Sequence, residues 1–394
     1  MAAADQTELE AALGAVIDPE LNLTLGELGL VRSVRPKRRR ALLEVALPVA
    51  AWPSVDALAD EIHRVALAVP GVEEVELDFV VMGDEERNTL RQRLRAGMLG
   101  IDPDAPEDDE HDHDHDQGHG HAHGQAAAMP LFLGPDSRTR VIGVSSGKGG
   151  VGKSTVTVNL SIALAQAGYS VGLLDADVYG FSVPKMLGTD HDPVILGDIV
   201  IPTSAHGVRC LSMGYFVPDD QPVIWRGPML HKAIQQFLTD AYWGEPDFVL
   251  VDMPPGTGDV ALTLAEVMPR AEIVVVTTPQ PAAQRVAQRS AFAARRLKLS
   301  VRGVIENMSW FTGDDGKRYE LFGAGGGATL AADLGVPLLG QVPLVNAIRL
   351  GGDEGHPITV VEPDSETAQS FRTIADKLAA LGPARVYRRE LTLR

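Results

Sequence analysis

The sequence predicts an α/β protein built around a doubly wound parallel sheet, preceded by a second and smaller α/β domain. Three observations support this prediction. From about Thr139 onward, short and nearly continuous apolar runs alternate with helical patterns, as in strands that are buried on both faces. Alternating strands and helices favour a parallel sheet with right-handed crossovers. The chain of 394 residues exceeds one ordinary domain, and its 45% hydrophobic content allows sizeable cores.

Six apolar runs mark the strands that we expect in the larger domain. They are VIGVSS, VGLLD, FVLVD, EIVVVTT, VRGVIENM and LLGQVP. Ligands of parallel α/β sheets bind beyond the carboxyl ends of the strands. Polar residues that directly follow these runs are therefore the first candidates for a functional site.

The first hundred residues predict the smaller domain. The segment TELEAALGAVI has helical spacing of its apolar residues, and RSVRP and ALLEVALPV read as two strands around a basic turn. An amphipathic helix, SVDALADEIHRVALAV, follows Ser54 as its expected N-cap. The alternating segment VEEVELDFVVM predicts a strand, and ERNTLRQRLRAGML predicts a charged closing helix.

Residues 101–128 contain no periodic apolar pattern. An acidic stretch, IDPDAPEDDE, precedes the tract HDHDHDQGHGHAHG, and this composition predicts a disordered linker. We therefore expect domains at residues 1–100 and 129–394. Imidazoles are ligands for zinc, nickel, copper and iron, so the tract is a candidate transition-metal site, with a solvated linker as the alternative. The candidate ligands are His111, His113, His115, His119, His121 and His123.

Composition excludes several classes of protein. The formal net charge is −18, which argues against a dedicated nucleic-acid binder and against adhesion to anionic membranes. No uninterrupted apolar window is long enough to span a bilayer, and the N-terminus has no secretory-signal pattern. The single cysteine, Cys210, fits a reducing compartment. We expect a cytoplasmic protein with no nucleic-acid or membrane partner.

The segment GKGGVGKST follows the strand VIGVSS and opens a helical pattern. It matches the phosphate-binding pattern G-x-x-x-x-G-K-[ST] in the strand–loop–helix context that the pattern requires. The pattern predicts that Lys153 contacts the β- and γ-phosphates of ATP and that Ser154 ligates Mg²⁺ in an ATPase. The expected nucleotide-binding residues are Gly147, Lys148, Gly149, Gly150, Val151, Gly152, Lys153, Ser154 and Thr155.

Carboxylates follow two of the other expected strands. Asp175 and Asp177 come after VGLLD, where a carboxylate can lie near Mg²⁺ or orient the attacking water, although an Asp-rich turn remains an alternative. Asp252 ends FVLVD, the position of a carboxylate that holds Mg²⁺ directly or through water. The metal ligands that we expect are therefore Ser154, Asp175 and Asp252.

The loop holds a second lysine, Lys148, that an ordinary phosphate loop does not need. The pattern K-G-G-x-G-K-[ST] resembles the deviant Walker A group, which includes MinD, ParA, the nitrogenase iron protein and Mrp. In that group the extra lysine crosses a dimer interface to the partner's nucleotide. The resemblance implies an ATP-sandwich homodimer in which Lys148 is catalytic, since a second cation stabilises the transferring phosphoryl group.

The same resemblance assigns roles at the strand ends. It gives the water-orienting role chiefly to Asp177, so that Lys148, Lys153 and Asp177 are the catalytic residues. It places Asn307 at the adenine edge, where one amide supplies both a donor and an acceptor, and Pro343 and Leu344 along the base. A capping Asn and a plain strand-end Pro are the alternatives.

Three further segments, IWRGPM, DADVYGFS and DMPPGTGD, resemble the Mrp family, also called the ApbC-type iron–sulfur cluster carriers, over about residues 139–375. In the first hundred residues, DPEL and PGVEEVEL resemble the MIP18/DUF59 domain that often precedes such an ATPase. The resemblance implies a protein that binds iron–sulfur clusters or transfers them to apoproteins. Client and assembly proteins would then be its partners.

Two departures from the family pattern concern thiolates. Typical members hold a bridging cluster through a C-x-x-C motif after E-N-M-S, where this chain has residues 312–316, TGDDG. Many relatives have a Cys-Pro pair where this chain has Trp52 and Pro53, and Cys210 lies in an apolar stretch typical of a buried structural residue. Iron–sulfur clusters depend on thiolate ligands, so binding of a cluster stays open.

Two other functions stay under consideration. One is an ATP-dependent dimeric switch or scaffold that carries no cluster and binds a partner through its N-terminal domain. The other is a positioning ATPase like MinD or ParA, which the net charge of −18 disfavours and which the short, weakly patterned C-terminus RVYRRELTLR also disfavours. In the N-terminal domain, Asp18 and Glu20 are candidate contacts for a partner or a metal, with turn formation as the alternative.

Overall fold

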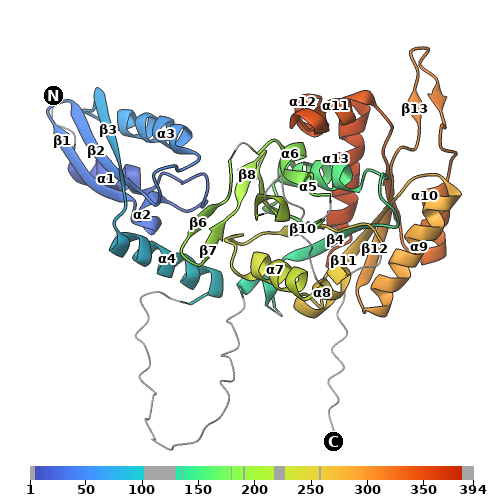
Figure 1. The fold of residues 1–394 in the computed structure, drawn as a ribbon. Coiled ribbons are helices and arrows are strands. Elements are labelled where there is room, and N and C mark those ends of the chain that lie inside the picture. The colour runs from blue at the N-terminus through green and yellow to red at the C-terminus, as the bar shows by residue number, and fades with distance from the viewer. Residues whose placement is uncertain are drawn as a thin grey trace, which may run out of the picture. The chain divides into compact units, whose positions relative to one another are not determined.

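The computed structural model describes residues 5–101, 130–134, 136–178, 180–189, 191–216, 227–256 and 259–383. The chain divides into two compact units, drawn in Figure 1. Unit 1 comprises Met1–Ser137 and Val194–Ile201, and unit 2 comprises Arg138–Pro193 and Pro202–Arg394. The hairpin of β6 (Val194–Leu196) and β7 (Ile199–Ile201) thus groups with unit 1, although the sequence analysis placed it in the larger domain.

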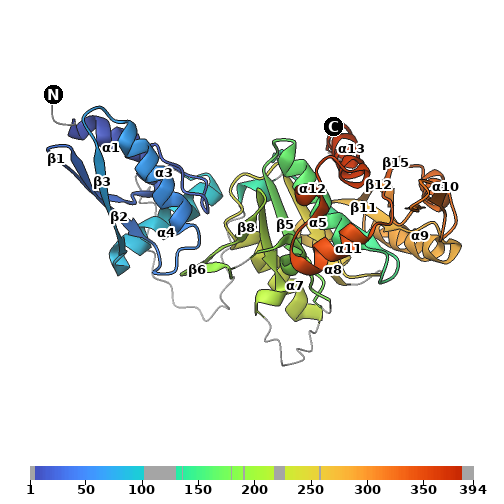
Figure 2. The same ribbon diagram turned by 90° about the horizontal axis from the view of Figure 1, so that it is seen from above.

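Unit 1 contains the elements that the sequence predicts. Its three-stranded sheet has the order β1-β2-β3, in which β1 and β2 are antiparallel and β2 and β3 are parallel. Figure 2 shows the helices of unit 1 beside this sheet. The bounds are α1 Gln6–Gly14, α2 Leu25–Leu28, β1 Val31–Lys37, β2 Arg40–Leu47, α3 Val55–Ala68, β3 Glu74–Val81 and α4 Asp84–Leu99.

Local sequence explains where these helices begin and which faces they bury. The Asp5 side chain accepts a hydrogen bond from the Thr7 backbone at the start of α1, and Thr24 forms a capping box with Glu27 at α2. Ser54, the expected N-cap of α3, makes no capping hydrogen bond and bonds elsewhere. On α3, the residues that are buried recur at every fourth position, as an amphipathic helix requires.

Unit 2 is built around an eight-stranded sheet with the order β15-β12-β11-β4-β10-β5-β9-β8. Neighbouring strands are parallel, except that β8 is antiparallel to β9 at the edge. This sheet confirms the predicted fold class, and its strands include the six predicted apolar runs. The bounds are β4 Arg140–Ser146, β5 Val171–Asp175, β8 Thr203–Ala205, β9 Val208–Ser212, β10 Phe248–Asp252, β11 Glu272–Thr277, β12 Ser300–Glu306 and β15 Leu338–Gln341.

Helices cover both faces of this sheet. Figure 1 shows α5 and α13 on one side of the sheet and α7, α8 and α9 on the other. Residues 156–164 of helix α5 are buried on every side, because α13 packs on this helix from outside. The bounds are α5 Lys153–Gln166, α6 Val183–Leu187, η2 Met213–Phe216, α7 Gly227–Thr239, α8 Asp259–Val267, α9 Pro281–Arg296, α10 Gly326–Leu334, α11 Asn346–Glu354, α12 Ile358–Val361 and α13 Glu366–Ala380. The short helix η1 (Leu131–Leu133) belongs to unit 1.

A short hairpin follows β12. Its strands are β13 (Phe311–Thr312) and β14 (Arg318–Tyr319), and Figure 1 shows it projecting from the rest of unit 2. This hairpin includes residues 312–316, where the resemblance implies a cysteine pair and this chain has none.

The register of the parallel strands brings their polar carboxyl ends together. Asp252 at the end of β10 pairs in register with Asp175 at the end of β5, and β4 ends beside them at Ser146. The edge where ligands bind in such sheets is thus lined by residues that the sequence analysis selected. Among the described residues, no helix is both long and apolar enough to cross a membrane.

Candidate nucleotide-binding site

The loop between β4 and α5 is shaped by its glycines. Gly152 lies in the left-handed region with φ of 78°, and a Cβ there would lie 2.2 Å from Asn307 Nδ2. Gly147 packs so tightly on α9 that a Cβ would lie 2.2 Å from the Ala287 backbone nitrogen. Only glycine fits at these two positions, and the loop then opens a helix whose N-terminus favours anions.

Asp252 is the centre of the polar cluster at the strand ends. Asp252 is fully buried, and its Oδ2 atom lies 2.6 Å from Lys153 Nζ. Ser154 Oγ donates to the same oxygen at 2.6 Å, and Thr157 Oγ1 donates to Oδ1 at 2.7 Å. The structure thus brings together the phosphate-loop lysine, the predicted magnesium-ligating hydroxyl and the predicted magnesium-binding carboxylate.

Asp177 lies on the other side of the same lysine. Its Oδ2 is 3.8 Å from Lys153 Nζ, and the residue is 8% exposed. Lys153 therefore lies between two carboxylates, and Asp252 is the nearer one by more than an ångström. A role of Asp177 in orienting the attacking water stays a prediction.

Asp175 organises the loop that follows β5. Its Oδ1 accepts from the Asp177 backbone at 3.1 Å, and its Oδ2 accepts from Ser212 Oγ at 3.0 Å and from the backbones of Ser182 and Val183. Burial, followed by the charge of Asp252, raises the pKa of Asp175 to about 7. A direct role of Asp175 in metal binding stays a prediction, because both its oxygens already accept hydrogen bonds that hold this loop.

Lys148, the second lysine of the loop, is half-buried. Its Nζ donates to Gln280 Oε1 at 3.3 Å, at the residue that precedes α9. The lysine that the resemblance places across a dimer interface is thus held within its own chain here. A role in a partner's site would require this hydrogen bond to break.

A cavity of about 210 Å³ adjoins the phosphate loop. The three predicted base-contact residues, Asn307, Pro343 and Leu344, line it together with the phosphate-loop residues Gly152 and Thr155. Its remaining walls are Met186, Met308, Val345, Ile348, Arg349, Gly352 and Asp353. These seven residues, like Thr157, were not selected from the sequence.

Asn307 connects this cavity to the loop. Its Nδ2 donates to the Val151 carbonyl at 2.9 Å, so one amide hydrogen is already engaged. A contact of this amide with the base stays a prediction. Thr157 was detectable from the sequence, because it lies one helical turn after Lys153 on the same face. No sequence signal identifies Met186 or Ile348, which come from α6 and α11.

The segment after β10 contacts the end of β4, directly before the phosphate loop. The Gly256 backbone donates to the Ser146 carbonyl at 2.8 Å, and its own carbonyl accepts from Ser290 Oγ at 3.0 Å. Residues 257 and 258 lie outside the described residues, as does the beginning of the IWRGPM segment.

The N-terminal carboxylates form a separate buried cluster in unit 1. Asp18 is fully buried and accepts from Trp52 Nε1 at 3.0 Å and from the Glu20 and Leu21 backbones. Burial, as the largest cause, raises the pKa of Asp18. Glu20 accepts from Ser54 Oγ. Turn formation and hydrogen bonding to Trp52 and Ser54 thus account for both carboxylates, apart from Glu20 Oε2, which is buried without a partner.

The thiol group of this chain is not accessible to solvent. Cys210, the single cysteine of the chain, is fully buried on β9, and burial raises its pKa well above the usual thiol value. The described residues hold no group of three or more His, Cys, Asp or Glu residues arranged for a metal ion. The six histidines of the 111–123 tract lie outside the described residues, so their metal binding stays a prediction.

The doubly wound sheet and the loop geometry define a P-loop nucleoside triphosphatase. A family model for the NUBPL iron-transfer P-loop NTPase matches residues 137–379, and a model for the iron-sulfur cluster assembly protein family matches residues 6–77. The chain belongs to the NUBPL iron-transfer P-loop NTPase family. These matches confirm both halves of the resemblance.

Named relatives match almost the whole chain. The iron-sulfur cluster carrier protein of Mycobacterium tuberculosis is 42% identical over 378 residues, which cover 94% of this chain and 92% of the relative. The protein of the same name from Bacillus subtilis is 39% identical over 342 residues, which cover 86% and 88%. A nucleotide-binding protein of Archaeoglobus fulgidus, solved in complex with ADP, is 32% identical with a TM-score of 0.50, covering 59% of this chain and 91% of that one.

Proposed function

We propose that this protein is a magnesium-dependent ATPase that acts as a homodimer in the transfer of iron–sulfur clusters to client apoproteins. The observation that supports the ATPase most directly is the buried cluster of Lys153, Ser154 and Asp252 at the end of the phosphate loop. The cargo follows from the family and from relatives named as cluster carriers.

The residues present fit ATP and Mg²⁺. Glycines with no room for a Cβ leave the loop amides for phosphate oxygens, and Ser154 and Asp252 supply the hard oxygen ligands that Mg²⁺ prefers. When bound, Mg²⁺ would neutralise charge on the β- and γ-phosphates. Phosphate binding would draw Lys153 from Asp252 to the nucleotide, which leaves Asp252 free for its metal role.

Other residues of the site would orient the attacking water and the nucleotide. Asp177, beside Lys153, would accept a hydrogen bond from the attacking water, and the 210 Å³ cavity would enclose the adenine. Lys148 would exchange Gln280 for the nucleotide of a second copy. Because the lysine must leave its own chain for that contact, hydrolysis would be coupled to dimer formation.

No thiolate of this chain is available to ligate an iron–sulfur cluster. Residues 312–316 hold no cysteine, and Cys210 is fully buried. We therefore propose that ligands for the cargo come from the client or an assembly protein, or from the histidine tract. A specific observation, the missing cysteine pair, also favours a second candidate function, an ATP-dependent switch or scaffold that carries no cluster.

Anaerobic reconstitution with iron and sulfide separates the two candidates. A transfer protein whose histidine tract holds the cluster would retain iron and sulfide with a visible chromophore. A transfer protein whose cargo is held by the client or an assembly protein would remain colourless alone but would speed activation of an iron–sulfur apoprotein when ATP and that assembly protein are added. Deletion of residues 111–123 tests whether the histidine tract is the ligand, because iron content should then fall. An iron-free, colourless dimer that still hydrolyses ATP, and that does not speed cluster transfer between assembly proteins, would leave the switch as the function.

A further inference from the structure

Helix α9 carries an exposed basic stripe that the nucleotide site does not use. Its sixteen residues include four arginines and no acidic residue, in a chain whose formal net charge is −18. Arg285, Arg289, Phe292 and Arg296 follow one another at helical spacing and are all exposed. We call these four residues the α9 stripe.

The opposite face of α9 explains why the stripe faces outward. Small residues are buried there, which lets the helix approach the sheet closely, as the contact between Gly147 and the Ala287 backbone shows. Ser290 on this face bonds to Ser145 Oγ at 2.8 Å and to the Gly256 carbonyl at 3.0 Å. The inner face thus contacts the phosphate loop and the segment after β10, while the stripe lies on the back of the same helix.

Among the described residues, the three arginines of the α9 stripe have no acidic partner, and its aromatic ring is exposed. Within the part of the chain that the structure describes, Arg285, Arg289 and Arg296 of unit 2 form no ion pair, whereas most exposed arginines of unit 1 pair with a carboxylate. Phe292 is 45% exposed between them. Arg295, at the edge of the stripe, donates to the Leu334 carbonyl.

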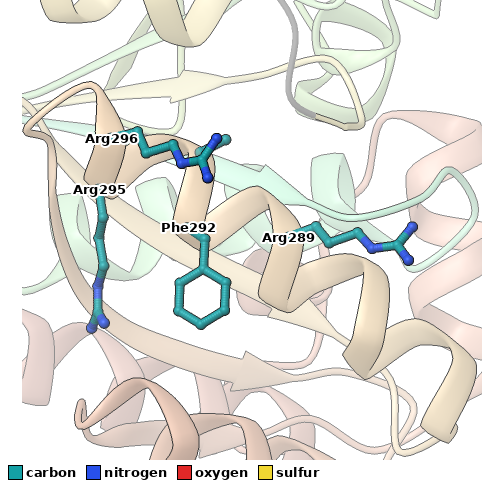
Figure 3. A pocket seen from close by; sticks show the side chains of 5 residues that line it. Arg289, Phe292, Arg295 and Arg296 are labelled. Carbon is teal, nitrogen blue, oxygen red and sulfur yellow. The ribbon is translucent and has the colours of Figure 1, made fainter.

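A hollow of about 620 Å³ lies over these residues and is lined by Arg289, Phe292, Ala293, Arg295 and Arg296. Figure 3 shows the Phe292 ring between the side chains of Arg295 and Arg289. Exposed aromatic and arginine side chains in such a hollow are the residue types that dominate binding energy in protein interfaces.

The length and the positive charge of the α9 stripe indicate which kind of molecule it binds. Arg296 lies eleven positions after Arg285. At the rise of an α-helix this distance is about 16 Å, which exceeds the size of one phosphate or carboxylate group. We propose that the α9 stripe is a docking surface for an acidic polypeptide segment of a partner protein. Its carboxylates would pair with the arginines, and an apolar side chain between them would cover Phe292.

A polypeptide fits this surface better than a nucleic acid. Duplex DNA carries one charge for about every 1.7 Å of its axis and would extend beyond the stripe over the surface of a chain with an excess of 18 negative charges. A short acidic segment can contact the stripe alone and avoids most of that repulsion. Phe292 also offers an apolar contact where a phosphate backbone would need a cation. The surface is independent of the proposed function, because its occupation requires neither nucleotide nor iron.

The test measures fluorescence anisotropy of a labelled synthetic peptide of glutamate and leucine, added to the full-length protein without nucleotide or iron. The expected result is saturable binding that a glutamine-for-glutamate version of the peptide does not show. Arg289→Glu/Arg296→Glu should weaken binding by about tenfold or more, and Phe292→Ser should weaken it as well. Circular dichroism establishes that each variant is folded.

The matched control is Arg64→Glu/Arg87→Glu, which changes the net charge equally but replaces arginines of unit 1 that pair with acids on their own helices. This variant should bind the peptide like the unsubstituted protein. Equal loss in both double variants would overturn the proposal, because net charge would then explain binding. Equal binding by all variants, or preferential binding of duplex DNA over the peptide, would overturn it too.

Discussion

Lys153 and Asp252 form a buried ion pair at the carboxyl end of the parallel sheet, with 2.6 Å between Nζ and Oδ2. Their side chains are 6% and 1% exposed. Ninety-nine positions separate the two residues in the chain, and strand β10 lies next to β4, whose following loop carries the lysine. Removing either partner should therefore affect both the candidate chemistry and the stability of unit 2.

We predict that Lys153→Ala reduces ATP turnover by about 10²-fold or more, because a cation aimed at the transferring phosphoryl group is lost. The same variant should lower the free energy of unfolding by about 3 kcal/mol, because Asp252 is left buried and unpaired. Steady-state phosphate release and urea unfolding measure the two effects.

The double variant Lys153→Ala/Asp252→Asn separates the two roles. Asp252→Asn removes the buried negative charge that Lys153→Ala leaves unpaired, so part of the lost stability should be recovered. Turnover should remain as low as in Lys153→Ala. A double variant that is less stable than Lys153→Ala would contradict the ion-pair account, and unchanged turnover in the single variant would contradict the phosphate-loop assignment.

Lys148→Ala should abolish ATP-dependent dimerisation and slow hydrolysis by about tenfold or more, while ATP binding to the monomer persists. Light scattering with a non-hydrolysable ATP analogue and calorimetric titration measure the two properties. Gln280→Ala is the control, since it removes the acceptor of Lys148 and retains the ammonium group. If Lys148→Ala still dimerised with the analogue, the role of this lysine across the interface would be excluded.

Asp177→Ala should slow hydrolysis by about 10²-fold while leaving nucleotide affinity within a few-fold, as expected for a residue that orients the attacking water. Single-turnover hydrolysis and nucleotide titration distinguish the two quantities. Asp315→Ala, on the exposed hairpin, is the matched control and should hydrolyse ATP normally. Normal single-turnover rates in Asp177→Ala would move the water-orienting role to another residue.

Asn307→Ala should weaken ATP binding by about tenfold, which corresponds to about 1.4 kcal/mol. The variant loses the hydrogen bond from Nδ2 to the Val151 carbonyl and also the acceptor that faces the base cavity. Ser309→Ala removes a nearby hydrogen bond to the Glu306 carbonyl and should leave affinity unchanged. Equal affinity of Asn307→Ala and the unsubstituted protein would argue against adenine in this cavity.

The raised pKa of Asp18 predicts that the stability of unit 1 depends on pH. Burial raises its pKa in the folded state above the value of 3.8, so the unfolded chain loses this proton first as the pH rises. The stabilising contribution of protonated Asp18 is complete below pH 3.8 and declines as the pH rises through the raised pKa. Asp18→Asn cannot titrate, so its stability should fall less over the same interval.

Hydrogen exchange of the backbone amides of residues 6–28, corrected for the intrinsic pH dependence of exchange, measures this difference. The protection of the unsubstituted protein should decline more steeply with rising pH than that of Asp18→Asn. Trp52→Phe, which removes the hydrogen bond from Nε1 and keeps the carboxyl, should retain the steep decline. Parallel pH profiles for the unsubstituted protein and Asp18→Asn would show that Asp18 is not responsible.

Local pattern predicted most of the fold. The strands of unit 2 are buried on both faces and therefore read as apolar runs, and the elements of unit 1 follow from their periodicity. The edge strand β8 and its neighbour β9 were not predicted. Strand β8 is only three residues long, and β9 runs into an apolar stretch with no turn signal at its end. Hairpin β6–β7 groups with unit 1 through contacts that lie far apart in the sequence.

The sequence by itself determined the phosphate loop, the carboxylates at the strand ends and the shortage of thiols, because each depends on residue identity within a short segment. Only the tertiary structure decided that Asp252 neutralises Lys153, that Gln280 holds Lys148, and that Met186 and Ile348 wall the base cavity. It also decided that the arginines of α9 face outward without acidic partners among the described residues. Strand register and helix packing set these contacts, and both depend on residues far apart in the chain.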